Sequence, residues 1–380
     1  MEKYISFIVL LFLLSSCSNT EDSSTYIYHP TEENLKRDVT FVLSNKNTQK
    51  QAEIGQIRDK LEKRKFLTSI GNLFGNEPEI FSDIFQVEIT DSEILIFERG
   101  NFRISRFDFQ GNFISNIEAT GRGPNELQQP LKISISNDTL YVMDGFDVKF
   151  LDLTQSDPIV ETLYSSENAV IEDLCSLNDK FLLRYYSTEV ASVNDSSAIL
   201  HVVDKESDEI KTSFGEPYKA NSPTWSRILS EGRVICNDET NTVVSITNIL
   251  PYIVAHNNQG VIKWVVEAEN FKPIIHRQHN VPEGSLNFRW NEEPFTHTSY
   301  TQLLNLHEFV LLQVTTFENF LNDNDRFQND KLKTDTYLIH SKTGESEYLG
   351  SDIPKILAIN DNYLIFEKEE EFPAIEVFEI

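Results

Sequence analysis

The side chains best suited to recognition chemistry concentrate in one stretch of the sequence, residues 270–300. This stretch is the least acidic part of a very acidic chain and carries six such residues: His276, Arg277, His279, Arg289, Trp290 and His297. Arginine and tryptophan are favoured at protein interfaces, and a long insertion in a compact fold is often functional. We therefore predict that it recognises a sugar or a carboxylate. The alternative is a surface loop that only packs on the rim of the fold.

A metal site is not predicted from these histidines. His276 and His279 have an i, i+3 spacing, but a zinc site needs a third ligand, and nothing in the sequence fixes Glu283 beside them. A second candidate set lies in the run LNDNDRFQND: Asp323, Asp325 and Asp330. This run lacks the glycine and the terminal glutamate of an EF-hand loop, which favours a solvated loop. Calcium is the only cofactor that the sequence suggests, and none is predicted.

The sequence contains no recognisable catalytic motif. There is no G-x-S-x-G, and the eight histidines are scattered without a serine or an acid placed by a motif. Sites assembled from distant parts of a chain are invisible in a single sequence. The missing motif therefore weakens an enzymatic function without excluding it.

Composition and charge narrow the class of protein. The 380 residues include 33 Lys and Arg against 60 Asp and Glu, a formal net charge of −27. So acidic a chain repels a phosphate backbone, which argues against nucleic acid as a partner. The chain has 26 Phe and 13 Tyr, and aromatic residues favour pleated sheets. Cys175 and Cys236 both lie within apolar stretches, so we favour two buried free thiols over a disulfide.

The first 17 residues, MEKYISFIVLLFLLSSC, have the form of a secretory leader. The apolar run from Tyr4 to Leu14 has the length of a signal peptide and is too short to span a bilayer stably. It ends in a sequence, LSSC, that resembles a lipobox, whose cysteine is acylated and becomes the mature N-terminus. We therefore predict a signal peptide over 1–17 and lipidation of Cys17, palmitate included. The alternative is an ordinary signal peptide with an accidental cysteine.

Residues 18–64 are predicted to form a polar tether and an N-terminal extension. Glu21 and Asp22 resemble the short acidic signals that follow the lipidated cysteine of surface lipoproteins in Bacteroidota. We therefore expect a lipid-anchored protein of the cell envelope, at the outer membrane, with the leaflet left open. No later segment approaches transmembrane length.

A repeated pair of hairpins dominates the rest of the sequence. The first kind, two apolar strands around a tight polar turn, recurs six times: 87–99, 133–145, 172–186, 226–239, 303–316 and 356–368. A second kind follows most copies: 107–121, 150–165, 201–215, 255–269 and 338–350. Two hairpins give four strands per repeat, as in a propeller blade. The sequence therefore predicts an all-β fold, a six-bladed β-propeller of four-stranded antiparallel blades. A β-sandwich is the alternative, and six matching repeats argue against it.

Two leftover strands indicate how the ring closes. The propeller is predicted over residues 65–380, with an insertion at 268–300 between blades 4 and 5. The last repeat ends at Ile380 without an outermost strand, and an unpaired strand-like piece, KFLTSIG, precedes the first repeat. We predict that residues 66–70 supply the outer strand of blade 6. Closure removes the exposed edges of an open ring.

The segment 117–153 contains the most specific motif of the chain. Its G-x-G-P-x-E pattern consists of four residues: Gly121, Gly123, Pro124 and Glu126. Asp144 closes the strand that follows. This segment resembles NHL-type propellers and, more closely, the six-bladed β-propeller lipoproteins of Bacteroidota. That pattern often has a glycine where this chain has Asn125, and asparagine also tolerates positive φ.

The motif is predicted to be a structural turn between blades. Gly121 and Gly123 permit conformations closed to other residues, and Pro124 stiffens the exit. Arg122 is predicted to pair with Glu126 across the turn, or alternatively to contact a ligand. A phosphate-binding function is excluded because no helix and no Lys-Ser/Thr pair follow.

The function expected for a lipid-anchored propeller of this kind is non-catalytic. We predict a membrane-tethered, monomeric binding or scaffold protein for a glycan, a peptide or an envelope partner. A propeller hydrolase or lyase, calcium-dependent or not, is the alternative. It should gather carboxylates or histidines at the central channel, whereas a binding protein should present an aromatic and arginine-lined surface.

Overall fold

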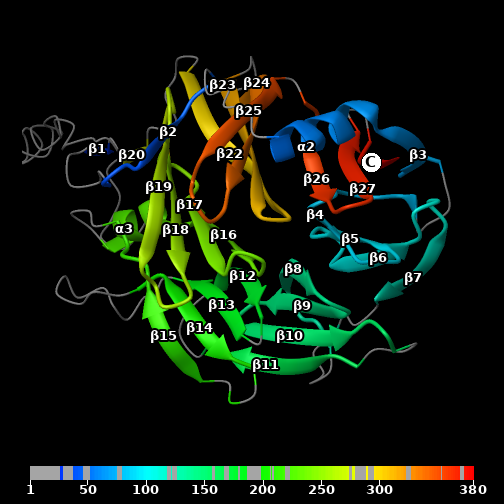
Figure 1. The fold of residues 1–380 in the computed structure, drawn as a ribbon. Helices are drawn as coiled ribbons and strands as arrows, with labels where there is room; N and C mark the ends of the chain where they lie inside the picture. Colours follow the sequence, from blue (N-terminus) through cyan, green and yellow to red (C-terminus); the bar gives the residue numbers. More distant parts are fainter. Residues whose placement is uncertain are drawn as a thin grey trace, which may run out of the picture.

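The computed structural model describes the following residues: 26–28, 37–45, 52–74, 79–117, 121, 126–155, 159–166, 171–178, 180–185, 198–205, 207, 209–218, 223–273, 276–278, 288–289, 295–321, 327–351, 353–368 and 372–380. Within them, six antiparallel sheets follow one another round a central axis (Figure 1). The fold is a six-bladed β-propeller, as the repeat predicts.

Each blade contains four consecutive strands, except that the chain's N-terminal part completes the last one. Blade 1 contains β4 (Gln86–Ile89), β5 (Ile94–Glu98), β6 (Arg103–Phe107) and β7 (Phe113–Ile117). Blade 2 contains β8 (Pro130–Ser136), β9 (Thr139–Asp144), β10 (Asp147–Asp152) and β11 (Glu161–Ser165). Blade 3 contains β12 (Ile171–Leu177), β13 (Lys180–Tyr185), β14 (Leu200–Asp204) and β15 (Ile210–Phe214).

The second half of the ring repeats this order. Blade 4 contains β16 (Gly232–Asn237), β17 (Thr242–Thr247), β18 (Tyr252–Asn257) and β19 (Ile262–Ala268). Blade 5 contains β22 (Phe295–Leu306), β23 (Phe309–Leu321), β24 (Phe327–His340) and β25 (Ser346–Ser351). Blade 6 contains β26 (Ile356–Ile359), β27 (Tyr363–Lys368), β28 (Ala374–Glu379) and β3 (Lys65–Ile70).

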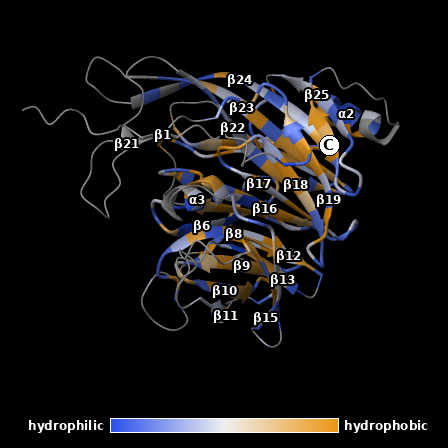
Figure 2. Cartoon of the chain, turned by 90° about the vertical axis from the view of Figure 1, so that its left-hand side faces the viewer, coloured by the Kyte–Doolittle hydropathy of each residue, from blue (hydrophilic) through white to orange (hydrophobic). Residues whose placement is uncertain are grey.

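The first strand of each blade lies nearest the axis, where it contacts the first strands of its two neighbours. Buried apolar clusters fill the space between each pair of neighbouring blades. Hydrophobic colouring accordingly runs along the strands of the blades in Figure 2. In blades 2, 3 and 4, the turn between the first two strands uses asparagine at positive φ: Asn137 (51°), Asn178 (55°) and Asn241 (48°). Asparagine tolerates this conformation better than most residues, so the turn chemistry sets the repeat.

The ring closes as the sequence predicts. Strand β3 pairs antiparallel with β28, with Thr68 opposite Val377 and Ile70 opposite Ile375. The outermost strand of blade 6 therefore comes from the N-terminal side of blade 1. This arrangement joins the two ends of the propeller by backbone hydrogen bonds.

The segment before β3 also packs on the ring. Strand β2 (Phe41–Leu43) adds a fifth, parallel strand to the outer edge of blade 4, beside β19. Helix α2 (Ala52–Lys63) places Ile57 and Leu61 in the apolar cluster between blades 5 and 6. Arg58 of this helix forms an ion pair with the buried Glu347 at 2.7 Å. Neither this helix nor the other described one is long and apolar enough to cross a membrane.

One predicted hairpin is wrong. The first hairpin of blade 4 was expected over 226–239, but Pro223–Ser230 forms helix α3, and the hairpin is β16 with β17. Proline fits the first turn of a helix, and Leu229 is fully buried. The turn that sets this hairpin ends at Asn241 rather than within the expected range. In blade 5, strand β22 begins at Phe295, inside the segment expected to be an insertion.

The expectation of two free thiols is also wrong. Cys175 on β12 and Cys236 on β16 form a disulfide, with their Cα atoms 5.5 Å apart. The first strands of blades 3 and 4 are neighbours at the axis, although the two cysteines are 61 residues apart in sequence. The apolar residues around each cysteine in the sequence therefore gave no sign that both thiols lie at the contact between blades 3 and 4.

Candidate binding site in the central channel

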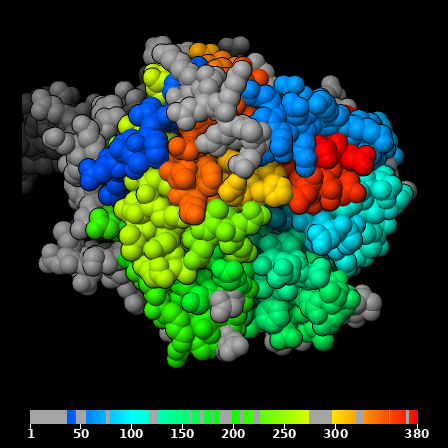
Figure 3. All heavy atoms as spheres, viewed as in Figure 1, coloured from blue at the N-terminus to red at the C-terminus, as the bar shows by residue number. Residues whose placement is uncertain are grey.

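A channel runs through the ring along the six first strands. It has a volume of about 1150 Å³ and is lined by residues of every blade. Figure 3 shows the blades in chain order round this axis. Small-molecule sites are concave spaces of roughly 300–1,000 Å³, so the channel is large enough to hold a ligand.

The charged side chains of the lining balance one another. Six are basic: Arg99, Lys132, Arg227, Arg233, Lys331 and Lys355. Six are acidic: Asp83, Glu88, Glu172, Asp173, Glu231 and Glu367. In the whole chain, acids outnumber bases by 60 to 33. The channel is therefore much less negative than the molecule around it.

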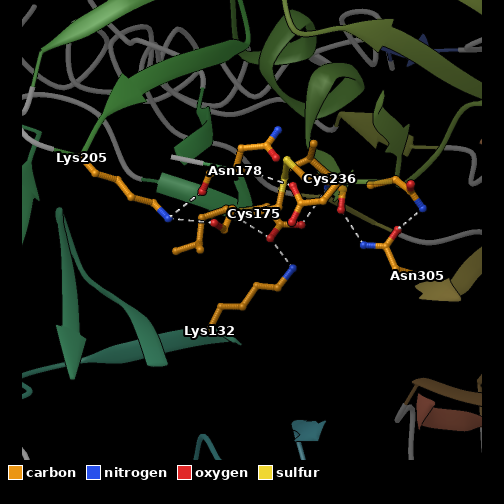
Figure 4. Close-up of a disulfide and its surroundings, with 12 residues drawn as sticks. Lys132, Cys175, Asn178, Lys205, Cys236 and Asn305 are labelled. Carbon is orange, nitrogen blue, oxygen red and sulfur yellow. Dashed lines mark hydrogen bonds and ion pairs between the residues drawn. A yellow bond between two sulfur atoms is a disulfide. The ribbon is translucent and has the colours of Figure 1, made fainter. Parts of the chain in front are cut away.

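The seam between blades 2, 3 and 4 is built around Asp173 on β12. Lys132 of β8 forms an ion pair with its buried carboxylate. The same carboxylate accepts the backbone N–H groups of Leu174 at 2.7 Å and Val234 at 2.8 Å. In Figure 4, Lys132 points toward this strand next to the disulfide. A buried charge pair is stable only when its remaining hydrogen-bonding capacity is satisfied, which is the case here.

Two carboxyl groups of the lining have strongly perturbed acidity. Burial raises the pKa of Glu88 to about 7, although the hydrogen bond from Gln86 (2.6 Å) and the charge of Lys132 oppose this shift. Burial also raises the pKa of Glu172 to about 7, against the charge of Arg184, whose Nε lies 3.6 Å away. Such groups exchange protons near neutral pH and can serve as general acids or bases.

Arg233 on β16 is a weakly compensated charge in the lining. Its Nη1 donates a hydrogen bond to the carbonyl oxygen of Thr301 at 3.0 Å. In the part of the chain that the structure describes, no carboxylate reaches ion-pair distance of it. Burial lowers the pKa of Arg233, and the negative charge of Asp173 partly offsets this effect.

The first strands of blades 5 and 6 supply a neutral wall, although Lys331, Lys355 and Glu367 of the same blades also line the channel. The first strand of blade 5 lines the channel with Gln302 and Leu304, and that of blade 6 with Leu357 and Ile359. Above them, the long strands of blade 5 carry a row of hydrogen-bonded hydroxyl groups: Thr301 to Thr315 at 2.8 Å, and Thr315 to Thr334 at 3.0 Å. This side of the channel offers apolar surface and hydroxyl groups.

Phe317 extends the neutral wall at the same strands of blade 5. It lines the channel, and the ring of His297 stacks on it at 5.4 Å between centroids. His297 is itself buried and contacts Asn319. It therefore supports the aromatic wall rather than standing free as a ligand.

The predicted structural turn is described in part. Asp144, at the end of β9, accepts the N–H of Gln128 at 2.9 Å and forms an ion pair with Lys149. Lys149 also donates to the carbonyl oxygen of Glu126. A Cβ at Gly121 would lie 1.8 Å from the carboxylate of Glu126, so a larger residue there would require the Glu126 side chain to move. These contacts attach the junction to blade 2.

Most of the predicted binding residues lie away from this channel or outside the described residues. His276 and Arg277 lie on β20 (His276–Gln278) and Arg289 on β21 (Phe288–Arg289), in a three-stranded sheet with β1 (Tyr26–Tyr28). The backbones of Arg277 and Arg289 are directly opposite each other. Outside the described residues lie several of the others: Cys17, Arg122, Gly123, Pro124, His279 and Trp290. Their roles stay predictions.

Sequence reasoning missed the charged residues of the channel. Glu88, Lys132 and Arg233 each stand singly between apolar residues of a first strand, as in VEI, LKI and GRV. A lone charge inside an apolar strand is a usable signal, because it must face either water or a partner. The convergence of these charges becomes visible only when the blades form a ring.

No group of three or more His, Cys, Asp or Glu side chains is placed to hold a metal ion within the described segments. Asp330 lies on β24, whereas Asp323 and Asp325 are outside those segments. A second hollow of about 360 Å³ lies at hairpin turns of blades 1, 4, 5 and 6. There the His307 Nε2 lies 2.7 Å from Asp361.

Comparison with known proteins supports the architecture. A family model for a domain of unknown function, described as a 6-bladed beta-propeller, matches residues 72–229, which contain blades 1–3 and most of α3. A protein of Bacteroides fragilis NCTC 9343, named as exported, has 13% identity over 84% of this chain and 94% of its own, with a TM-score of 0.50. At such identity the likeness concerns the fold alone.

Two further solved structures show a weaker likeness. A member of the DUF4221 family from Bacteroides vulgatus has 11% identity over 83% of this chain and 97% of its own, with a TM-score of 0.46. A protein of unknown function from Bacteroides thetaiotaomicron VPI-5482 has 9% identity over 83% of this chain and 75% of its own, with a TM-score of 0.45. No curated protein matches the chain.

Proposed function

We propose that this protein is a membrane-tethered, extracytoplasmic propeller that binds a ligand in its central channel without transforming it. The observation that carries the proposal is the charge balance of the channel within a chain of net charge −27. A channel with paired charges on one side and apolar and hydroxyl groups on the other matches ligands with both polar and apolar parts. Glycans and peptides have this character, and an envelope protein could present either.

The proposed location agrees with two independent features. The leader ends at Cys17 in a sequence typical of lipid attachment, and the propeller contains the disulfide Cys175–Cys236. Structural disulfides persist in oxidising compartments and are rare in the cytosol. The proposal includes attachment at the outer membrane and a monomeric propeller.

The tether is tested by changing Cys17→Ala. If lipid attachment holds the protein, this variant leaves the membrane fraction, because a single polar tether has no affinity for the bilayer. Labelling with a radioactive fatty acid should mark the unchanged protein only. Persistence of the variant in washed membranes would contradict lipid anchoring.

Ligand binding is tested by thermal shift on a soluble form that begins at Tyr26. Oligosaccharides, peptides and Ca²⁺ are added one at a time, and a ligand at 100 times its Kd stabilises the fold by about 2.7 kcal/mol. A hit should disappear in Ser134→Trp, which fills the channel from β8, and persist in Thr162→Trp on the exposed rim of the same blade. A hit that survives Ser134→Trp and disappears in Arg289→Ala would assign binding to the predicted insertion instead.

A second candidate function, a hydrolase or lyase, is favoured by one observation. Glu88 and Glu172 line the channel with pKa values of about 7, which suits general acid–base chemistry. The two functions differ in turnover. Any ligand found above should be recovered unchanged after prolonged incubation, whereas a product that forms with wild type and not with Glu88→Gln would establish the enzymatic alternative.

A further inference from the structure

We propose that Arg233 binds a carboxylate group of the channel ligand, which is therefore an organic acid. This inference rests on the proposed function, because it names the chemical class that the channel takes. The geometry that carries it is the position of one guanidinium group between a satisfied ion pair and a neutral wall.

The charge of Arg233 has little compensation from the protein. The side chain is mostly buried in the channel wall, and its one hydrogen bond goes to the carbonyl oxygen of Thr301 at 3.0 Å. Among the described residues, no acid pairs with it. Burying an arginine without a partner is costly, so a site of this kind favours an anion.

The nearest acid cannot serve as that partner. Asp173 already binds Lys132, and both of its oxygens accept backbone N–H groups, from Leu174 and Val234. Its negative charge affects the pKa of Arg233 from a distance, without an ion pair. Turning Asp173 toward Arg233 would break the seam between blades 3 and 4, next to the Cys175–Cys236 disulfide.

A carboxylate fits the donor set that remains. A guanidinium presents several N–H groups in a planar fork, which bind the two oxygens of a carboxylate in parallel. The hydrogen bond to Thr301 uses one of these groups and fixes the orientation of the fork toward the seam with blade 5. The ligand's carboxylate would replace water at the others.

The neighbouring wall defines the rest of the ligand. Beside Thr301 on β22 lie Gln302 and Leu304, and β26 adds Leu357 and Ile359. An anionic head at Arg233 thus leaves the body of the ligand beside the apolar and hydroxyl groups of these strands. Because acidic and basic residues balance in the lining, an anion meets no net repulsion there.

The test is calorimetric titration of the full chain in mild detergent with two acids and their neutral amides. The probes are glucuronate with glucuronamide and hexanoate with hexanamide, which distinguish a sugar acid from a fatty or peptide-like acid. We expect at least one acid to bind about tenfold more tightly than its amide, because only the acid forms a charged hydrogen-bonded pair. Raising the salt concentration should weaken the binding of the acid more than the binding of its amide.

The variants assign that preference to Arg233. Arg233→Gln should reduce the affinity for the acid about tenfold and leave the amide unchanged, while Arg233→Lys should retain part of it. Lys211→Gln, which removes one positive charge from the rim of blade 3, is the matched control. It should change neither the affinity for the acid nor the affinity for the amide. A melting experiment shows whether Arg233→Gln folds. If it does not, the test uses Arg233→Lys alone, which should lower the ratio of acid to amide affinity.

The outcomes separate this inference from the proposed function. Equal binding of acid and amide, or an acid preference that survives Arg233→Gln, overturns the role of Arg233 while channel binding stands. Failure of both acids to bind at about 10 mM overturns it as well. If no compound raises the melting temperature, and Ser134→Trp changes the binding of no probe, the proposed function itself is overturned.

Discussion

The first strands of blades 1–4 bring charged side chains into the channel wall, whereas those of blades 5 and 6 bring only neutral ones. In the charged sector, the Lys132–Asp173 ion pair joins blades 2 and 3, and the disulfide of Cys175 with Cys236 joins blades 3 and 4. The seam between blades 1 and 2 uses an amide, because Gln86 bonds the backbone N–H and carbonyl of Ile133. In the neutral sector, apolar packing and amide hydrogen bonds hold the seams, such as those of Gln313 to the chain before β26.

This difference shows two solutions to the same structural problem. Propeller blades meet over apolar faces, and the innermost backbone groups still need hydrogen-bond partners. The neutral sector satisfies them with uncharged side chains and gains stability from packing. In the charged sector, the carboxylate of Asp173 accepts two such N–H groups and pairs with Lys132, and burying this ion pair costs desolvation energy. Retaining this arrangement is reasonable if the charges also serve a ligand, and a covalent crosslink fixes the strands that carry them.

The largest expected effect concerns the closure of the neutral sector. Deleting residues 60–72 removes β3 from the edge of blade 6 and exposes β28 and its apolar cluster. We expect loss of cooperative melting, because the ring then has an open edge. Removing residues 18–25, which precede β1, is the control and should leave the melting temperature unchanged. Normal melting of the first deletion would show that the charged sector alone maintains the ring.

The disulfide gives the next largest effect. It closes a loop of 61 residues, which corresponds to about 4 kcal/mol of stability in the chain-entropy description. Cys175→Ser with Cys236→Ser should therefore lower the free energy of unfolding by roughly this amount, measured by denaturant titration. Adding reductant to wild type should reproduce the loss, and it should have no effect on the double variant. No loss in either experiment would mean that packing alone fixes the charged sector.

The closure of the ring and the repeat were predictable because both depend on local signals. Apolar strands around tight polar turns recur once per blade, and KFLTSIG was left without a partner. The hairpin of blade 4 was misplaced because the helix-forming Pro223–Ser230 segment is also apolar enough to resemble a strand.

The site was less predictable for a physical reason. Glu88, Lys132 and Asp173 stand far apart in the sequence, and only the ring geometry brings them to one wall. The same holds for the disulfide, whose cysteines lie on consecutive first strands. The 270–300 stretch attracted attention because its charges are contiguous in the sequence, but its strands β20 and β21 form a small sheet with β1 rather than part of a blade.

A pair of single substitutions compares the two sectors directly. Asp173→Ala leaves Lys132 and two backbone N–H groups without their acceptor, which should cost about 3–5 kcal/mol. Gln313→Ala, in the neutral sector, frees the N–H of Ile356 and the carbonyl of Pro354 and should cost about 1–3 kcal/mol. Denaturant unfolding of both variants measures the difference. Equal losses would mean that charge adds nothing to the strength of the seam.

The smallest expected effect concerns the protonation of Glu88. Besides burial, its pKa depends on the hydrogen bond from Gln86 and on the charges of Lys132 and Asp173. Its pKa is raised from 4.5 to about 7 in the folded protein, so the fold favours the protonated form. The stability that this provides is complete below about pH 4.5 and is lost as the pH rises through about 7. Glu88→Gln, which stays neutral, should therefore raise the melting temperature relative to wild type more at pH 8 than at pH 5.

Asp108, in a turn of blade 1, is the matched control for this measurement. Hydrogen bonds from the side chain and backbone of Asn112 hold the pKa of Asp108 below its ordinary value of 3.8. Its contribution to stability is present above that value and is lost only at lower pH, so Asp108→Asn should have the same effect at pH 5 and pH 8. If Glu88→Gln behaves in the same way, its carboxylate is charged throughout this range. Glu88 would then carry its negative charge at pH 5 as well, and its protonation should not strengthen the binding of an organic acid at Arg233 at pH 5 relative to pH 8.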